Sequence, residues 1–317
     1  MNHWELFKQS WSIFWRHKAL WVFGLLVALG GGFNFSFSFA DVRSVTSLTP
    51  GARELLSDLF AGIDLTPLII GGLIIGAISL VLGTFGEAAL ISMVDDLAGG
   101  RSVSVATGAR AARLRFWPLL LTRLLLVLPV FIIGVLAAGS FLSAFSGLLR
   151  GGSRDERSIL GGLGVLSALG VIGFAVGLLS WAVSISAQRA VVLDQMSPGQ
   201  ALVRGWKWLW AKFADYLVVA VIFLALGIAA GAVLACVLAP IVCGVLLSSL
   251  PSLSQLRPGV QVFETVFTIA GWTALILILV GLIVGSLVSV FVSGVWTLAY
   301  REWRVSLSPA PPAPVTT

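Results

Sequence analysis

The 317-residue chain is poor in charged residues and in the residue types that most often perform chemistry. Charged residues make up only 11% of it, against about 25% in a typical soluble domain, so the chain cannot cover itself with a polar surface. Its two histidines, His3 and His17, have no cysteine or carboxylate at ligand spacing, and we therefore predict no metal site. Its two cysteines, Cys236 and Cys243, would lie about 10 Å apart along one helix, which is too far for a disulfide.

Recognisable catalytic and phosphate-binding motifs are also missing. The sequence has no Gly-rich phosphate loop, no nucleophile elbow and no HExxH run. A membrane-embedded lipid enzyme would need acidic residues that converge near one membrane surface, and one such set exists: Glu87, Asp95, Asp96 and Asp194. The three aspartates are more simply helix-capping or loop residues. We therefore predict a protein that is not an enzyme and has no cofactor.

Apolar residues dominate the chain. Hydrophobic residues make up 58% of it, the mean hydropathy is +1.03, and several apolar runs exceed the roughly 20 residues that a helix needs to cross a bilayer. A membrane β-barrel would instead show short segments of alternating hydrophobicity. The sequence therefore predicts an all-α, polytopic integral membrane protein.

One pattern occurs three times: a basic, Trp-containing amphipathic segment followed by apolar residues. Aligning Trp15, Trp117 and Trp210 gives spacings of 102 and 93 residues. We interpret each copy as an interfacial amphipathic helix plus a helical hairpin, which gives six transmembrane helices in a single domain over residues 1–305. The repeats would cover about 1–100, 101–196 and 197–305, and the Pro-rich residues 306–317 are predicted to be disordered.

Tryptophan and cationic side chains of these amphipathic segments are predicted to anchor the protein at the membrane surface. The predicted anchors are Trp11, Trp15, Arg16, Lys18, Arg113, Trp117, Trp206, Lys207, Trp210 and Lys212.

The predicted crossings cover about residues 19–32, 67–93, 105–142, 159–189, 216–247 and 267–300. The range 105–142 includes the middle amphipathic segment. Pro129 and Pro240 predict kinks. Residues 33–39 alternate phenylalanine with small or polar residues, and a surface helix is expected after Pro50. A signal peptide is an alternative for the first segment, with its basic residues before residue 19 and a small-residue cleavage site at 38–40.

Local signals at helix ends and helix faces give further predictions. Gly99 and Gly100 indicate the end of the second crossing. Ser197, Pro198 and Gln200 predict a capping box at the start of the third amphipathic helix. Glycines of the second crossing predict faces on which neighbouring helices approach closely, and these are Gly71, Gly72, Gly76, Gly83 and Gly86.

The distribution of cations predicts the orientation. Six of the twenty Lys and Arg residues would lie on one side of the membrane, and they are Arg43, Arg53, Arg150, Arg154, Arg157 and Arg257. The remaining fourteen lie on the side that holds both termini and the amphipathic segments. The positive-inside rule places that side in the cytoplasm, with the protein in the plasma (in bacteria, inner) membrane.

Two charged residues are predicted to lie inside the membrane. Glu87 and Arg123 each lie about six residues, or about 9 Å, inside the cytoplasmic ends of consecutive crossings. Because an unpaired charge in lipid is costly, we hypothesise an ion pair. Alternatively, Arg123 snorkels to lipid phosphates while Glu87 is protonated or reaches water. Aligning Asp95 with Asp194 places Ser186 at the position of Glu87, so the acid is not a repeated feature, which favours a special role.

Two segments resemble a group of poorly characterised bacterial multipass proteins that are often grouped with the membrane domain of some glycerophosphoryl diester phosphodiesterases. These segments are residues 189–206, RAVVLDQMSPGQALVRGW, and residues 10–21, SWSIFWRHKALW. The resemblance covers most of residues 1–300. The catalytic domain of the phosphodiesterases has no counterpart here, so the resemblance implies a membrane module and not phosphodiesterase activity.

The function that the sequence favours is a non-catalytic membrane module that packs with lipids or other membrane components. Because the cations cluster beside apolar segments, the expected partners are the bilayer and anionic lipid headgroups, with other membrane proteins or further copies of the chain, and not nucleic acid. The alternative is a transporter or permease with Glu87 and Arg123 near a substrate path. Three repeats do not give the paired halves of many secondary transporters, although a dimer would restore symmetry. A water-accessible cavity between the repeats would favour the transporter.

Overall fold

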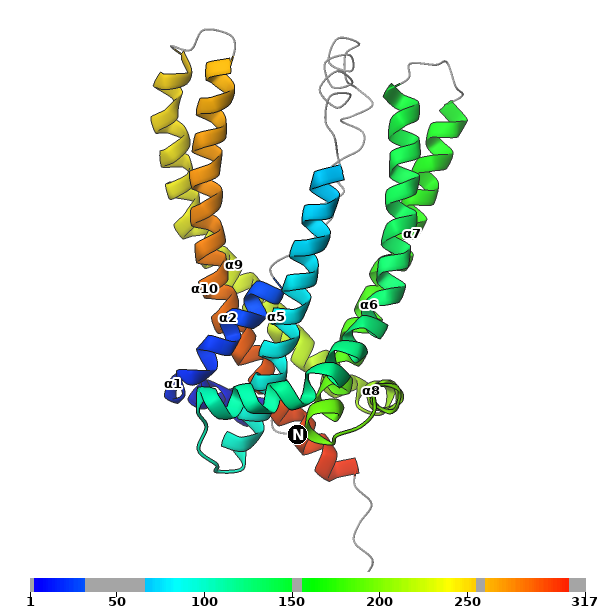
Figure 1. Cartoon of the computed structure of the whole chain (residues 1–317), viewed down its shortest axis with the longest axis vertical. Coiled ribbons are helices and arrows are strands. Elements are labelled where there is room, and N and C mark those ends of the chain that lie inside the picture. The colour runs from blue at the N-terminus through cyan, green and yellow to red at the C-terminus, as the bar shows by residue number, and fades with distance from the viewer. Residues whose placement is uncertain (1–2, 32–65, 150–155, 255–259, 308–317) are drawn as a thin grey trace, which may run out of the picture.

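The computed structural model describes residues 3–31, 66–149, 156–254 and 260–307, and these residues form helices and no strands. The helices are α1 (His3–Arg16), α2 (Ala19–Gly31), α5 (Thr66–Ala98), α6 (Val105–Leu149), α7 (Glu156–Leu193), α8 (Pro198–Ala211), α9 (Phe213–Ser254) and α10 (Val260–Leu307) (Figure 1). The predicted all-α class is confirmed. The expected segments at 33–39 and after Pro50 lie outside the described residues, as does nearly all of the predicted tail.

Four of these helices contain stretches that are long and apolar enough to cross a membrane: Ile70–Ala98, Val105–Phe141, Gly164–Leu193 and Ile278–Ser306. Two further stretches qualify only as bent pairs. Trp4–Arg16 and Ala19–Gly31 meet at 103°, and Pro198–Ala211 and Phe213–Ala229 meet at 86°. The described chain is therefore that of a helical membrane protein with four candidate crossings, or up to six if each bent pair is one span.

The long helices extend beyond the predicted crossings. The last two, α9 and α10, cover Phe213–Ser254 and Val260–Leu307, where crossings over 216–247 and 267–300 were expected. α9 continues to Ser254, past the predicted end of the fifth crossing at residue 247, and Pro251 removes one helical hydrogen bond there without ending the helix. α7 likewise begins at Glu156, before the predicted crossing over 159–189.

The amphipathic segments lie together at the base of the molecule. Figure 1 shows α1, α8 and the first turns of α6 across the base, from which the long helices rise. The first and third segments are separate helices, as predicted, but the second is continuous with α6. Pro118 and Pro129 both lie inside α6. Because proline removes a helical hydrogen bond, it permits a change of direction without ending the helix.

The core of the protein lies near this base. α2 packs between α5 and α10, α5 contacts α6, and α6 pairs with α7. The largest fully buried side chains include Leu20, Phe23, Leu90, Trp296 and Tyr300, whereas the upper residues of α5 are mostly exposed. In Figure 1 the far ends of the α9/α10 and α6/α7 hairpins stand apart on either side of α5.

Glycine allows α2 and α5 to approach each other closely. A Cβ on Gly30 would overlap the backbone of Gly83, and one on Gly86 would lie 2.8 Å from the carbonyl oxygen of Phe23. Gly71, Gly72 and Gly76 have nothing within 4 Å of a Cβ among the described residues. The prediction of close approach is therefore correct for Gly83 and Gly86 and wrong for the other three, because no described helix covers their face of α5.

Replacing Gly30 with alanine is expected to separate α2 from α5 and lower the free energy of unfolding by about 1–3 kcal/mol, the usual cost of overpacking. The measurement is the thermal midpoint of the purified chain in detergent. Gly76→Ala is the matched control, since its Cβ enters open space. Equal midpoints for the two variants would contradict the α2–α5 contact.

Two helix ends are closed by local hydrogen bonds. After α5, the Gly100 amide donates to the Leu97 carbonyl (3.0 Å) and the Arg101 amide donates to the Asp96 carbonyl (2.8 Å), with Gly100 at φ +76°. This is the Schellman arrangement, and it confirms the predicted helix end. Before α6, the Ser104 amide donates to Thr107 Oγ1 (2.9 Å) and the Thr107 amide donates to Ser104 Oγ (3.2 Å), a reciprocal cap that the sequence analysis missed.

The predicted capping box at Ser197 is correct in the position of the helix start but wrong in its side-chain hydrogen bond. Ser197 is the N-cap of α8 and Pro198 is its first residue, but the Ser197 side chain makes no capping hydrogen bond. Pro198 has no amide hydrogen to satisfy, and its ring already fixes the first helical φ. The exposed Ser197 contributes its backbone carbonyl instead, which accepts from the Ala201 amide at 2.9 Å.

Candidate functional site

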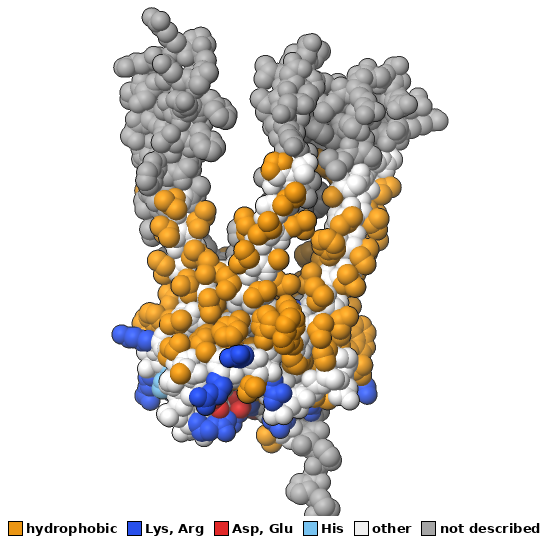
Figure 2. Space-filling model, viewed as in Figure 1, with side chains coloured by type: hydrophobic (Ala, Val, Ile, Leu, Met, Phe, Trp, Pro, Cys, Tyr) orange, Lys and Arg blue, Asp and Glu red, His pale blue; other side chains and the backbone are white. Residues whose placement is uncertain are grey.

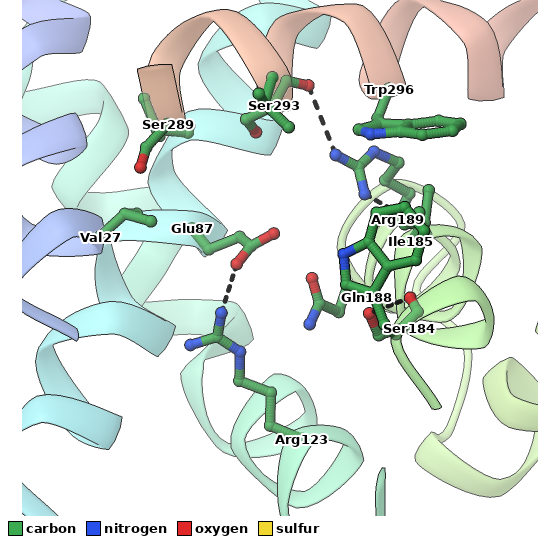
Figure 3. A pocket seen from close by; sticks show the side chains of 13 residues that line it. Val27, Glu87, Arg123, Ser184, Ile185, Gln188, Arg189, Ser289, Ser293 and Trp296 are labelled. Carbon is green, nitrogen blue, oxygen red and sulfur yellow. Dashed lines mark hydrogen bonds and ion pairs between the residues drawn. The ribbon is translucent and has the colours of Figure 1, made fainter. Parts of the chain in front are cut away.

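A cavity of about 240 Å³ lies between helices α2, α5, α6, α7 and α10. That volume is roughly eight times the volume of one water molecule in the liquid. Its charged lining residues are Glu87, Arg123 and Arg189, and Gln188 and three serines add polar groups (Figure 3). Trp181 and Trp296 form much of its apolar wall. The cavity therefore joins polar groups from all three predicted repeats inside the membrane-spanning part of the chain.

Glu87 and Arg123, which the sequence analysis pairs, lie in contact in this cavity. The Arg123 Nη2 donates to Glu87 Oε2 at 2.5 Å, and the Nη1 lies 3.4 Å from Thr84 Oγ1. The two side chains are 16% and 21% exposed, so the pair is mostly shielded. A Cβ on Gly83 would lie 3.2 Å from the Arg123 Nη1, so the same glycine that admits α2 also leaves room for the guanidinium.

Arg189 is the member of the site that the sequence analysis missed. It was counted as a cytoplasmic cation at the end of the fourth crossing, but it is only 2% exposed. Its Nη1 donates to the Ile185 carbonyl (2.5 Å) and its Nη2 to the Ser293 carbonyl (3.4 Å), while its Nε has no partner. No described carboxylate forms an ion pair with it. Buried charges are usually paired, so this arrangement is unusual.

The remaining polar groups lie around the two arginines. Gln188, which is 6% exposed, lies in Figure 3 between the Glu87–Arg123 pair and Arg189. The Ser293 hydroxyl is buried and has no hydrogen-bond partner. Trp296 lines the same cavity as Arg189 (Figure 3). Because two arginines face one glutamate, the lining carries a formal charge of +1.

The other three acids of the possible lipid-enzyme set do not line the cavity. Asp194 contacts Arg204 (2.6 Å), Arg304 (3.1 Å) and the Tyr300 hydroxyl (2.5 Å). These contacts tie the end of α7 to α8 and α10. The four acids therefore do not converge on one site.

A second set of ion pairs ties the end of α5 to α10. Asp95 contacts Arg301 at 3.1 Å and Arg101 at 3.6 Å, and Asp96 contacts Arg101 at 2.6 Å. Among the residues that the structure describes, no group of three or more His, Cys, Asp and Glu residues could hold a metal ion.

The predicted anchors lie on the surface and away from the cavity. The five tryptophans among them are between 46% and 69% exposed, and these are Trp11, Trp15, Trp117, Trp206 and Trp210. The cations Arg16, Lys18, Arg113 and Lys207 are exposed, and Lys212 is half-buried. In Figure 2 the lysines and arginines gather at the base, below a continuous hydrophobic band. This distribution fits a membrane surface at the level of the base.

Trp208 marks the opposite, buried face of α8. Its ring lies 4.8 Å from the Tyr300 ring, and the Arg204 guanidinium lies 4.7 Å from the centre of the Trp208 ring. The face of α8 with Trp206 and Trp210 is exposed, so this helix is amphipathic in the way the pattern predicts.

Comparison with known proteins places the chain in a family without assigning its activity. No curated protein matches the chain. No solved structure matches it either. A family model described as a domain of unknown function matches residues 1–303, which is nearly the whole chain. The protein therefore belongs to the DUF7847 family.

Proposed function

We propose that the protein is a non-enzymatic membrane transporter in which the cavity between the three helical hairpins receives a polar ligand. The observation that carries this proposal is the charged lining of the cavity, with Glu87, Arg123 and Arg189 inside membrane-spanning helices. Ionisable residues within a membrane commonly mark a ligand or ion path. A module that only packs with lipids or proteins would explain the glycine contacts but gives no reason for a polar cavity.

The same proposal includes six crossings arranged as three repeats. The bends of 103° and 86° fall at equivalent places, directly after Trp15–Arg16 and Trp210–Ala211, and Pro118 follows Trp117 at the third such place. Counting each bent pair as one span gives an amphipathic helix and a hairpin in every repeat. The cations at the base support cytoplasmic termini in a plasma membrane through the positive-inside rule (Figure 2).

Cysteine accessibility tests whether the cavity is hydrated. In a Cys236→Ser/Cys243→Ser background, Ser184→Cys and Ser289→Cys place thiols on the cavity lining. Both are expected to react with a small, membrane-impermeant methanethiosulfonate reagent, because the polar lining retains water. Thr297→Cys is the matched control, since Thr297 is fully buried on α10 and does not line the cavity. Absence of labelling at both cavity positions, from both sides of the membrane, would exclude the transporter and favour the packing module.

A further inference from the structure

We infer that the cavity binds a singly charged oxyanion of the phosphate type and that Arg189 is the residue that receives it. This inference rests on the proposed function, because it names the ligand class of the same cavity. It follows from three observations: the charge of the lining, the incomplete bonding of a buried arginine and the donors that surround it.

The charge of the lining is positive and incompletely balanced. Arg123 has its counter-charge in Glu87 at 2.5 Å, whereas Arg189 has no carboxylate within ion-pair distance among the described residues and shares the cavity with a glutamate that is already paired. A cationic ligand would meet two guanidinium groups, and a neutral ligand would leave the positive charge uncompensated. One negative charge brings the formal charge of the site to zero, and in a medium of low dielectric constant that balance is strongly favoured.

Arg189 has unused bonding capacity despite being 2% exposed. A guanidinium has five N–H groups, and the two hydrogen bonds of Arg189 are to backbone carbonyls. Its Nε is without a partner. A planar guanidinium matches the paired oxygens of a phosphate or carboxylate, whereas backbone carbonyls alone leave its charge uncompensated.

Donors on two helices favour a tetrahedral oxyanion over a planar one. Gln188 on α7 and Ser293 on α10 line the cavity beside Arg189, and the Ser293 hydroxyl lacks a partner (Figure 3). The oxygens of a phosphate group point in several directions and can accept from both walls at once. The volume of about 240 Å³ holds such a group together with a few water molecules.

The structure also allows a merely structural role, in which Arg189 holds α7 to α10 through the Ser293 carbonyl. The two roles differ in their dependence on Glu87. A structural arginine would not respond to anions in solution. A receiving arginine would bind anions more tightly when the competing charge of Glu87 is removed.

The test uses the full chain purified in a neutral, phosphate-free detergent, with its thermal midpoint measured against probe concentration. One arm uses inorganic phosphate, and the other uses dioctanoyl phosphatidylglycerol in mixed micelles, with dioctanoyl phosphatidylcholine as the zwitterionic comparison. We expect a saturable rise in the midpoint with at least one anionic probe and none with phosphatidylcholine. Saturation by inorganic phosphate identifies a soluble anion as the source, and saturation by phosphatidylglycerol alone identifies a lipid headgroup.

Variants assign the binding to Arg189. Arg189→Gln should weaken binding at least tenfold, and Glu87→Gln should tighten it about tenfold by removing a nearby negative charge. Arg110→Gln, which replaces an exposed arginine that neither lines the cavity nor belongs to the predicted anchors, should leave the affinity unchanged. Because Glu87→Gln also frees the Arg123 guanidinium, the double variant Glu87→Gln/Arg123→Gln decides if Arg189→Gln does not fold: retained anion binding assigns the ligand to Arg189, and lost binding overturns that assignment.

No saturable shift with either anionic probe, in the wild type and in Glu87→Gln, would overturn the inference. An affinity of Arg189→Gln equal to that of Arg110→Gln would do the same. Labelling of Ser184→Cys and Ser289→Cys would remain in that case, so failure of the ligand assignment is distinguishable from failure of the transporter.

Discussion

Replacing Glu87 with glutamine is expected to lower the free energy of unfolding by about 3 kcal/mol. The change leaves the Arg123 guanidinium mostly buried, at 21% exposure, without its carboxylate. Removing one partner of a buried ion pair typically costs about 3–5 kcal/mol, and the residual exposure places this pair at the lower end. Thermal midpoints in detergent, compared with those of the wild type, give the measurement.

The double variant Glu87→Gln/Arg123→Gln is the internal control for this prediction. Because it removes both charges, it should be more stable than Glu87→Gln alone, and the cycle of four proteins isolates the interaction between the two side chains. If the stability losses of the two single variants summed to that of the double variant, Glu87 and Arg123 would not act as a pair. That result would favour the alternative in which Arg123 snorkels to lipid phosphates.

Replacing Asp194 with alanine is the second change with a large expected effect, a loss of about 2–4 kcal/mol. Asp194 accepts hydrogen bonds from Arg204 and Tyr300 and forms an ion pair with Arg304, and its side chain is only 8% exposed. Hydrogen bonds that involve a charged group contribute about 1.5–3 kcal/mol each, although the 54% exposure of Arg304 reduces its share.

Asp96→Ala is the matched control for Asp194→Ala. Asp96 pairs at 2.6 Å with Arg101, but that arginine is 65% exposed, and exposed pairs contribute about 0–1 kcal/mol. Thermal midpoints of the two variants should therefore differ clearly. Similar midpoints would mean that the Asp194 contacts do not hold α7, α8 and α10 together.

The class of the protein and the contact between Glu87 and Arg123 follow from simple physical arguments. Long apolar runs define membrane helices, and tryptophan beside basic residues marks their ends. Two opposite charges at similar depth on consecutive helices have few alternatives to pairing, since lipid offers no counter-charge. In each case the relevant interaction is either local or between neighbouring segments.

Arg189 could not be placed in this way. Its burial depends on α10, and the Ser293 carbonyl that it contacts lies 104 residues further along the chain. Because it lies at the predicted cytoplasmic end of the fourth crossing, it resembled an ordinary cytoplasmic cation. The sequence places Arg189 at the end of an apolar run. That position indicates how deep in the membrane the residue lies, but it does not indicate which helix covers it.

The glycines show a similar limit. Gly76 and Gly83 are seven residues apart on α5 and look alike in sequence, yet only Gly83 faces a neighbouring helix. Periodicity identifies a face but does not identify what packs against it. The boundary between α1 and α2 was predictable because the amphipathic pattern ends there, whereas Pro118 and Pro129 lie inside α6 without ending it.

The ion pairs at the base constrain the order in which the molecule can assemble. Arg301 and Arg304 stand one turn apart on α10, and they reach Asp95 at the end of α5 and Asp194 at the end of α7. Because α10 follows both helices in the chain, neither contact can form until the third hairpin has been synthesised and inserted. Until α10 is in place, Arg101 is available to Asp95 and Asp96 and Arg204 is available to Asp194, so the contacts that join α5 and α7 to α10 form last.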